Sequence, residues 1–123
     1  MRYITDRKRA AGRGASHSGT SHHWSMQVTA VMLAFMVPVW IYILGQALGG
    51  SRAEVLAIFS RPFPAILTGL ILVVSMRHFA KGATMMIEDY AKGSARKIAV
   101  MLVTSLAGVI AATGLYALIK IVL

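Results

Sequence analysis

Long apolar stretches alternate with short polar segments along this chain. Residues 26–48 and 98–119 carry no charged side chain, and each is long enough to cross a bilayer, which takes about 20 apolar residues in a helix. A third apolar stretch lies between them. The pattern predicts an all-α membrane protein with three transmembrane helices, at about residues 26–48, 63–88 and 98–120.

The middle stretch differs from the other two because ionisable residues interrupt it. Its uncharged part, residues 62–76, makes roughly 22 Å of helix, which is shorter than a hydrocarbon core of about 30 Å. To cross the membrane, this helix must continue through Arg77, His78 and Lys81. We therefore expect His78 to lie inside the membrane-embedded bundle, while the long side chains of Arg77 and Lys81 reach toward the lipid headgroups.

Small residues recur at helical spacing in the third stretch. Their overlapping small-x-x-x-small patterns allow two helices to approach closely; the residues are Ala107, Gly108, Ala111 and Ala112. Small residues are common in membrane helices in general, so composition alone is the competing explanation. A helix–helix contact at this stretch is the expectation.

Composition agrees with a membrane protein. The 123 residues are 57% hydrophobic and 14% charged, and a soluble domain of this size could not cover so much apolar surface with a polar exterior. The chain has no cysteine, which excludes disulfides, thiolate metal sites and iron–sulfur clusters held by this chain alone. The net charge of +9 surrounds the apolar stretches, so we do not expect nucleic-acid binding.

The positions of the basic residues predict the orientation of the chain. Residues 1–25 and the connection between the second and third spans are rich in arginine and lysine, whereas the first connection has only Arg52 and Arg61, and the C-terminus only Lys120. By the positive-inside rule, the N-terminus is cytoplasmic and the C-terminus periplasmic, in a bacterial inner membrane. The expected organisation is a basic cytoplasmic arm, residues 1–25, followed by a three-helix anchor, residues 26–123.

The ionisable part of the middle span suggests a cofactor site. At 100° per residue, His78, Gly82 and Asp89 share one face of a helix. An imidazole inside a bundle and beside a glycine suits haem, which needs an axial nitrogen ligand and space for its flat ring. Arginine or lysine nearby could pair with the haem propionates. The residues alone leave open a structural histidine that is hydrogen-bonded to a neighbouring helix.

Other chemistry has less support in the sequence. The arm histidines, His17, His22 and His23, could bind a metal ion or supply a second haem ligand, but no acidic ligand accompanies them. The four carboxylates of the chain form no nucleophile–base or metal-protease motif, which argues against hydrolytic chemistry by this chain alone.

Two motifs resemble a known family. His78, Gly82, Asp89 and Tyr90 follow the order H-x3-G-x6-D-Y at the end of the second of three spans, and "HHWSMQVTAVML" leads into the first span. Both resemble the hydrophobic membrane-anchor subunits of succinate dehydrogenase, respiratory complex II. The resemblance covers most of the chain: the basic arm, the three spans and the loop after the second span.

The resemblance implies a role for each motif residue. His78 would ligate the iron of a haem b that is shared with a histidine of a partner cytochrome b subunit. Tyr90 would donate a hydrogen bond to a carbonyl oxygen of ubiquinone, and Asp89 would support that site by pairing with a basic residue of a partner. FAD and iron–sulfur clusters would belong to the flavoprotein and iron–sulfur subunits, so this chain would have no independent catalytic activity.

One position departs from the family pattern. Members often carry an arginine two residues before the "TA" of the first span, where this chain has Gln27. If that arginine normally contacts a haem propionate, Arg77 or another chain must take its place.

Two alternatives to the resemblance remain at the level of sequence. A small helical transporter or channel subunit could use Arg77, His78 and Lys81 as an ion path, although the other two spans carry no charge and transporters tend to show polar residues or symmetry in several spans. The other alternative is a structural anchor that binds no cofactor.

Overall fold

Helices account for nearly all of the structure, a computed structural model that describes residues 5–8 and 19–123. Three of the helices are long, namely α2 (Gly19–Ala47), α4 (Pro62–Tyr90) and α5 (Gly93–Val122), and one is short, α3 (Arg52–Phe59). Within these ranges there is no strand. Each long helix has the length and hydropathy needed to cross a membrane, so the prediction of an all-α protein with three spans is confirmed.

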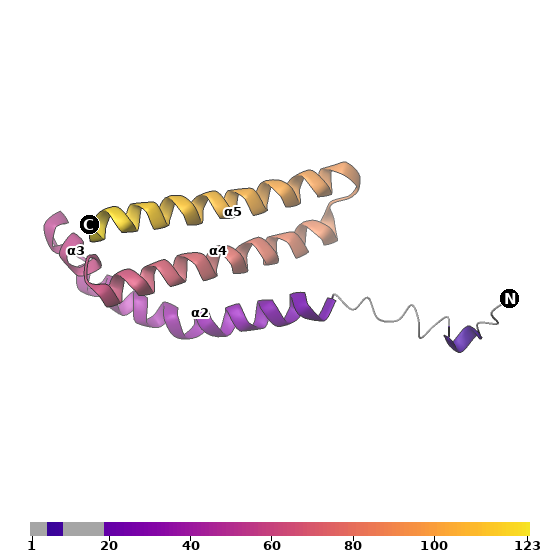
Figure 1. Cartoon of the computed structure of the whole chain (residues 1–123), viewed down its shortest axis with the longest axis horizontal. Coiled ribbons are helices and arrows are strands. Elements are labelled where there is room, and N and C mark those ends of the chain that lie inside the picture. Colours follow the sequence, from indigo (N-terminus) through magenta and orange to yellow (C-terminus); the bar gives the residue numbers. More distant parts are fainter. Residues whose placement is uncertain (1–4, 9–18) are drawn as a thin grey trace.

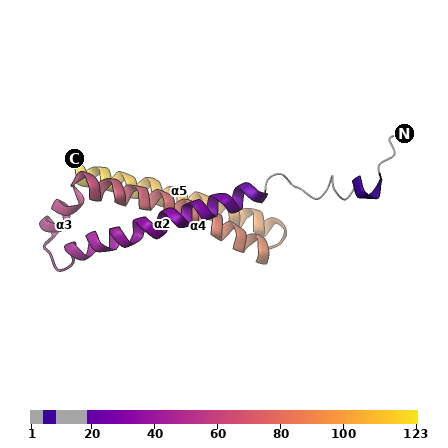
Figure 2. The same ribbon diagram turned by 90° about the horizontal axis from the view of Figure 1, so that it is seen from below.

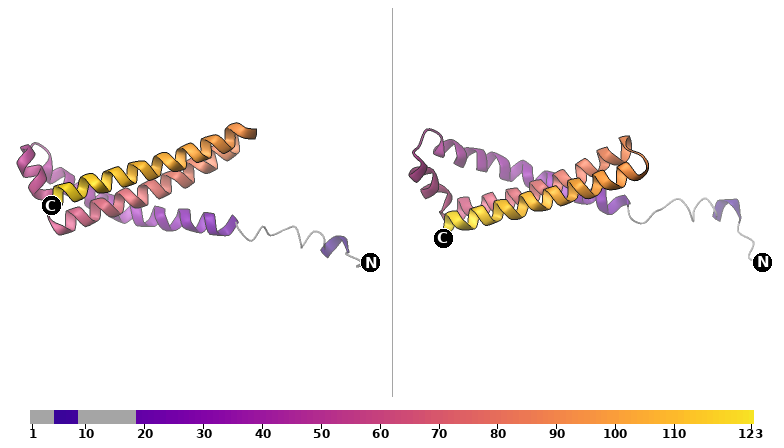
Figure 3. Two further views of the ribbon diagram at one scale, coloured as in Figure 1. Left: turned by 45° about the horizontal axis from the view of Figure 1, so that its top comes forward. Right: turned by 90° about the horizontal axis from the view of Figure 1, so that it is seen from above.

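Helix α4 is the central element of the bundle. It packs along α5 as an antiparallel hairpin and also contacts α2, whereas α2 and α5 do not approach each other in the described part of the chain (Figure 1). Seen from below, α2 crosses α4 at an angle while α4 and α5 stay side by side (Figure 2). The views in Figure 3 agree with this arrangement. The ionisable residues of the middle span therefore lie on the helix that has neighbours on two sides.

The helices are longer than the spans expected from hydropathy. Helix α2 begins at Gly19, so residues 19–25 of the predicted arm are helical, including the region of Trp24. Helix α4 continues without interruption through Arg77, His78 and Lys81, as the crossing of a membrane requires. Most of the predicted arm, residues 1–4 and 9–18, lies outside the described residues.

Sequence motifs for helix ends explain several of the boundaries. Pro62 opens α4, a position where its fixed φ suits the helix and its missing N–H costs nothing. Gly49 and Gly93 have φ values of 80° and 61°, a conformation that glycine adopts readily. Gly49 lies in the turn that follows α2, and Gly93 is the first residue of α5.

Helix α3 was not predicted from the sequence. A capping box begins it: the Ser51 side chain accepts from the Glu54 backbone N–H at 3.4 Å, and the Ser51 N–H donates to the Glu54 carboxylate at 2.7 Å. The signal is visible as "SRAE", a serine followed three residues later by glutamate. Hydropathy analysis missed this helix because eight residues are too few for a span.

Few side chains are buried within the single chain. Leu67 and Val74 of α4 and Ala107 of α5 are among the small set of buried apolar residues, and large apolar side chains face outward along all three long helices. Exposure of so large an apolar surface to water would be unfavourable, whereas contact with lipid or with apolar helices of a partner is favourable. The outward-facing side chains of the bundle therefore need lipid or partner helices around them.

The α4–α5 contact depends on small residues. Ala107 is only 3% exposed, and a β-carbon at Gly114 would overlap the side chain of Leu72 on α4. Gly108, by contrast, faces open space within the chain, and Ala112 is exposed. The predicted small-residue contact therefore exists, but it uses the face of Ala107, Ala111 and Gly114.

We expect Gly114→Val to destabilise the bundle, because the Leu72 side chain must shift from its present position to admit the added methyl groups. Overpacking of this kind costs about 1–3 kcal/mol, which should lower the melting temperature of the detergent-solubilised protein. Gly108→Val is the matched control on the same helix and should change the melting temperature little. Adding Leu72→Ala should relieve the Gly114→Val defect; strictly additive effects of the two changes would contradict the contact.

The capping box predicts a pH dependence for α3. Hydrogen bonds from the Ser51 side chain and backbone lower the pKa of Glu54 from its ordinary value of 4.5. A carboxylate with a lowered pKa in the folded state contributes stability above its ordinary pKa and loses that contribution as the pH falls through the folded value. Carbon-13 NMR of the Glu54 carboxyl should give a pKa below 4.5, and Ser51→Ala should move the pKa back toward it.

Candidate functional site

His78 lies at the contact between α4 and α2. Its Nδ1 atom is 2.8 Å from the Oγ1 atom of Thr29 on α2, and the imidazole is half-buried. Among the described residues, no hydrogen-bond partner contacts the other ring nitrogen, Nε2. One nitrogen of the ring is therefore fixed by the neighbouring helix, and the other is not occupied by any of the described residues.

Thr29 is the single buried polar residue in the described part of the chain, at 5% exposure. Its hydroxyl also lies 2.9 Å from the Ser25 carbonyl oxygen and 3.0 Å from that of Met26, one turn earlier in α2. Such back-bonding is common for threonine in helices. The sequence analysis did not identify Thr29, because a threonine in a span usually satisfies itself in this way.

A second threonine–ring contact joins the same two helices. The Trp40 indole N–H of α2 donates to the Thr68 hydroxyl of α4 at 3.0 Å, and Thr68 donates to the Pro64 carbonyl at 2.7 Å. In both contacts a threonine hydroxyl of one helix meets a ring nitrogen of the other. The threonine is on α2 in the first contact and on α4 in the second. They fix the rotation of α2 relative to α4 at two heights.

Gly82 lies one turn beyond His78 on the same helix. A β-carbon at this position would be 3.6 Å from the terminal methyl of Met26 and near no other side chain. The glycine therefore leaves room on the His78 face of α4, as expected from the sequence, and Met26 borders that room from α2.

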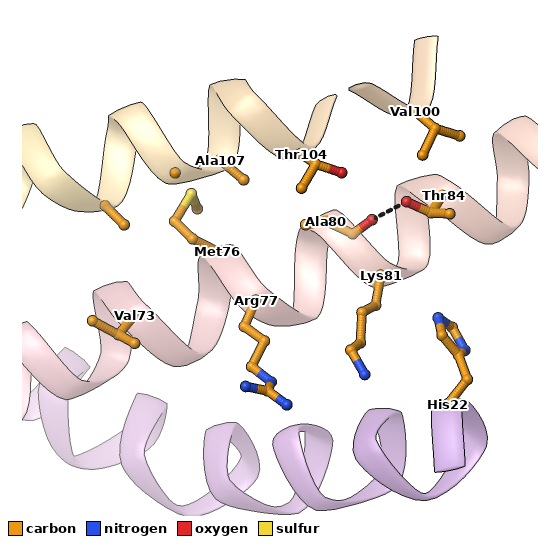
Figure 4. A pocket seen from close by; sticks show the side chains of 12 residues that line it. His22, Val73, Met76, Arg77, Ala80, Lys81, Thr84, Val100, Thr104 and Ala107 are labelled. Atoms are coloured by element: carbon orange, nitrogen blue, oxygen red, sulfur yellow. Dashed lines mark hydrogen bonds between the residues drawn. The ribbon is translucent and has the colours of Figure 1, made fainter. Parts of the chain in front are cut away.

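Arg77 and Lys81 border an open groove of about 740 Å³ between α4 and α5. In Figure 4 both side chains extend from α4 toward α2, and the ring of His22 extends toward them from the start of α2. The rest of the lining is largely apolar, with Val73, Met76 and Ala107 among its residues. His78 does not line this groove, so the structure separates the imidazole from the cationic groove on neighbouring sides of α4.

Asp89 and Tyr90 form the last turn of α4 and do not meet His78. Eleven residues separate Asp89 from His78, which corresponds to roughly 16 Å along a helix. Tyr90 is 85% exposed, and no hydrogen bond or ion pair of the described residues involves either side chain. The two parts of the H-x3-G-x6-D-Y motif therefore occupy different depths of the bundle.

The arm histidines do not form a metal site in the part that the structure describes. His22 borders the groove, His23 is exposed, and His17 lies outside the described residues. Across residues 5–8 and 19–123, no group of three histidine, cysteine or acidic side chains is arranged to hold a metal ion.

Comparison with known proteins gives a family and a relative. Residues 1–112 match the family model described as "Succinate dehydrogenase/Fumarate reductase transmembrane subunit". The chain is also 44% identical over 120 residues to the succinate dehydrogenase hydrophobic membrane anchor subunit of Paracoccus denitrificans, covering 98% of this chain and 93% of that protein. No solved structure matches significantly.

These matches agree with the three-span architecture and with the resemblance carried by the motif on α4. The family match covers all of α2, α3 and α4 and most of α5. The chain belongs to the succinate dehydrogenase/fumarate reductase transmembrane subunit family, as a multi-pass membrane anchor subunit.

Proposed function

We propose that this chain anchors a succinate:ubiquinone oxidoreductase in a bacterial inner membrane, ligates haem b through His78 and forms part of the ubiquinone reduction site. The observation that carries the proposal is the position of His78 between α4 and α2, with Nδ1 bonded to Thr29 and Nε2 without a partner in the described chain. Membership of an oxidoreductase anchor family also favours this function over the transporter or channel alternative.

The anchoring role draws support from the distribution of apolar surface and charge. The outward-facing apolar side chains of the long helices suit both lipid and the helices of a cytochrome b subunit. The start of α2 and the basic connection between α4 and α5 lie at the same end of the bundle (Figure 1). A cytoplasmic position of this end obeys the positive-inside rule, and the flavoprotein and iron–sulfur subunits would dock there.

The residues around His78 fit a haem. A half-buried imidazole with one ring nitrogen unbonded in the described chain is a suitable axial ligand, and the absent side chain at Gly82 leaves room beside it. Arg77 has no carboxylate partner among the described residues and is the candidate for a propionate, which the uncharged Gln27 cannot neutralise. When bound, the haem would supply a one-electron carrier inside the membrane, and the second axial ligand would come from the cytochrome b subunit.

The end of α4 has the properties of one wall of a quinone site. The exposed Tyr90 hydroxyl can donate a hydrogen bond to a quinone carbonyl oxygen and stabilise negative charge as the ring is reduced. The neighbouring Asp89 is exposed and can pair with a basic residue of a partner subunit. A position near the membrane edge admits an apolar quinone from the lipid and protons from water. Electrons would arrive from succinate through FAD and the iron–sulfur clusters of the partner subunits.

We expect His78→Leu to remove the haem signal, because leucine offers no ligand to iron. The measurement is a dithionite-reduced minus oxidised visible spectrum of the intact complex, purified through a tagged chain and normalised to flavin. His22→Leu is the matched control, and it should retain the b-type α-band. A normal band in the His78→Leu complex would reject His78 as the haem ligand.

Tyr90→Phe should weaken quinone reduction without affecting succinate oxidation. Loss of one hydrogen bond of about 1–1.5 kcal/mol corresponds to roughly a tenfold loss in kcat/KM for ubiquinone. Electron transfer from succinate to a soluble dye, which bypasses the quinone site, should remain normal.

Tyr116→Phe provides the control for this experiment. Tyr116 is also exposed, but it lies on α5 near the opposite end of the bundle, beside Lys120. Equal effects of the two substitutions on ubiquinone kinetics would contradict a specific role of Tyr90.

A further inference from the structure

We propose that Thr29 is a positioning residue for His78: it holds the proton of the imidazole on Nδ1 and directs Nε2 toward the haem iron. The proposal rests on the haem-binding function proposed above and adds the residue of this chain that prepares the ligand. It is carried by the hydrogen bonds around one buried hydroxyl.

The direction of the Thr29–His78 hydrogen bond follows from the other contacts of Thr29. A hydroxyl has one proton to donate and two lone pairs that accept. The Oγ1 atom lies within 3.0 Å of two backbone carbonyl oxygens, those of Ser25 and Met26, which can only accept. Because the hydroxyl proton is directed to these carbonyls, Oγ1 must accept in its 2.8 Å contact with Nδ1. His78 therefore donates through Nδ1–H.

This assignment determines which ring nitrogen can bind a metal. A neutral imidazole carries its proton on one nitrogen and a free lone pair on the other. With the proton on Nδ1, the lone pair is on Nε2, the nitrogen that has no partner in the described chain. Thr29 is 5% exposed, so water has little access to replace it as the acceptor. The hydroxyl fixes both the tautomer and the rotation of the ring.

The same hydrogen bond should also affect the electronic properties of the ligand. An imidazole that donates through its remote nitrogen is a more basic ligand, and greater basicity favours ferric over ferrous iron. Loss of the acceptor at position 29 should therefore raise the midpoint potential of the haem. A shift that arose from helix packing alone would be shared by other substitutions at the α2–α4 contact, which gives the proposal a control.

The Trp40–Thr68 contact supplies an internal control for helix packing. It joins the same two helices through a threonine hydroxyl that also donates to a carbonyl of its own helix. Thr68→Val and Thr29→Val each remove one hydroxyl from the α2–α4 contact. Only the second removes the acceptor for His78, so a comparison of the two separates ligand positioning from packing.

The test is a redox titration of the haem in the intact complex, with wild type, Thr29→Val, Thr29→Ser and Thr68→Val compared at equal haem-to-flavin ratio. We expect Thr29→Val to change the ferric-to-ferrous affinity ratio several-fold and up to tenfold, which is an upward shift of up to about 59 mV for a one-electron couple. The EPR spectrum of the ferric haem should change with it. Thr29→Ser keeps the hydroxyl and should restore both readouts, and Thr68→Val should leave both at wild-type values.

Each other outcome has a distinct meaning. A Thr29→Val haem with wild-type potential and EPR spectrum overturns the role of Thr29 and leaves the proposed function intact. An equal shift in Thr68→Val also overturns it, because helix packing would then explain the effect. If valine prevents assembly, Thr29→Cys, which is similar in size and a weak acceptor, replaces it in the same comparison. A wild-type complex without haem would instead refute the proposed function.

Discussion

A helix with ionisable residues in its second half must cross the membrane, and the arrangement of the other helices depends on this constraint. Every backbone polar group in a bilayer needs an internal partner, so α4 continues as one helix from Pro62 to Tyr90. The chain places it between α2 and α5. Its imidazole is half-buried against α2, while Arg77 and Lys81 reach a groove. The central position gives the least apolar span the most protein contact.

The sequence was sufficient for the long helices because their signal is local. Hydropathy and length alone identify a membrane helix, and the short apolar run before Arg77 already required the continuation through His78. Helix α3 has a local signal too, its capping box, but its eight residues are too few to appear as a membrane span. The small-residue contact was predicted on α5, and Ala107 and Ala111 of the predicted set lie on the contact face. The sequence could not show that Gly114 belongs to this face and Gly108 does not, since that depends on where Leu72 of the neighbouring helix lies.

For the candidate site, the sequence identified the motif residues on α4 but not the residue of α2 that contacts them. His78, Asp89 and Tyr90 stood out because ionisable groups near a span are rare, and the family resemblance supplied their expected roles. Thr29 could not be found in this way, because its contact with His78 depends on the rotation of α2 about its own axis. That rotation is set by packing and by two threonine–ring hydrogen bonds between residues that are distant in the sequence.

The exposed last turn of α4 has a consequence for assembly that follows from the helix macrodipole. The C-terminal end of a helix carries a partial negative charge, yet Glu88 and Asp89 are both in this turn, and it contains no basic residue. Each such carboxylate opposes the dipole by about 0.3–1 kcal/mol in exposed positions. A cation from a neighbouring subunit would attract both the carboxylates and the helix end, and so would offset this cost. An electrostatically unfavourable helix end in the free chain would then become an attachment point in the complex.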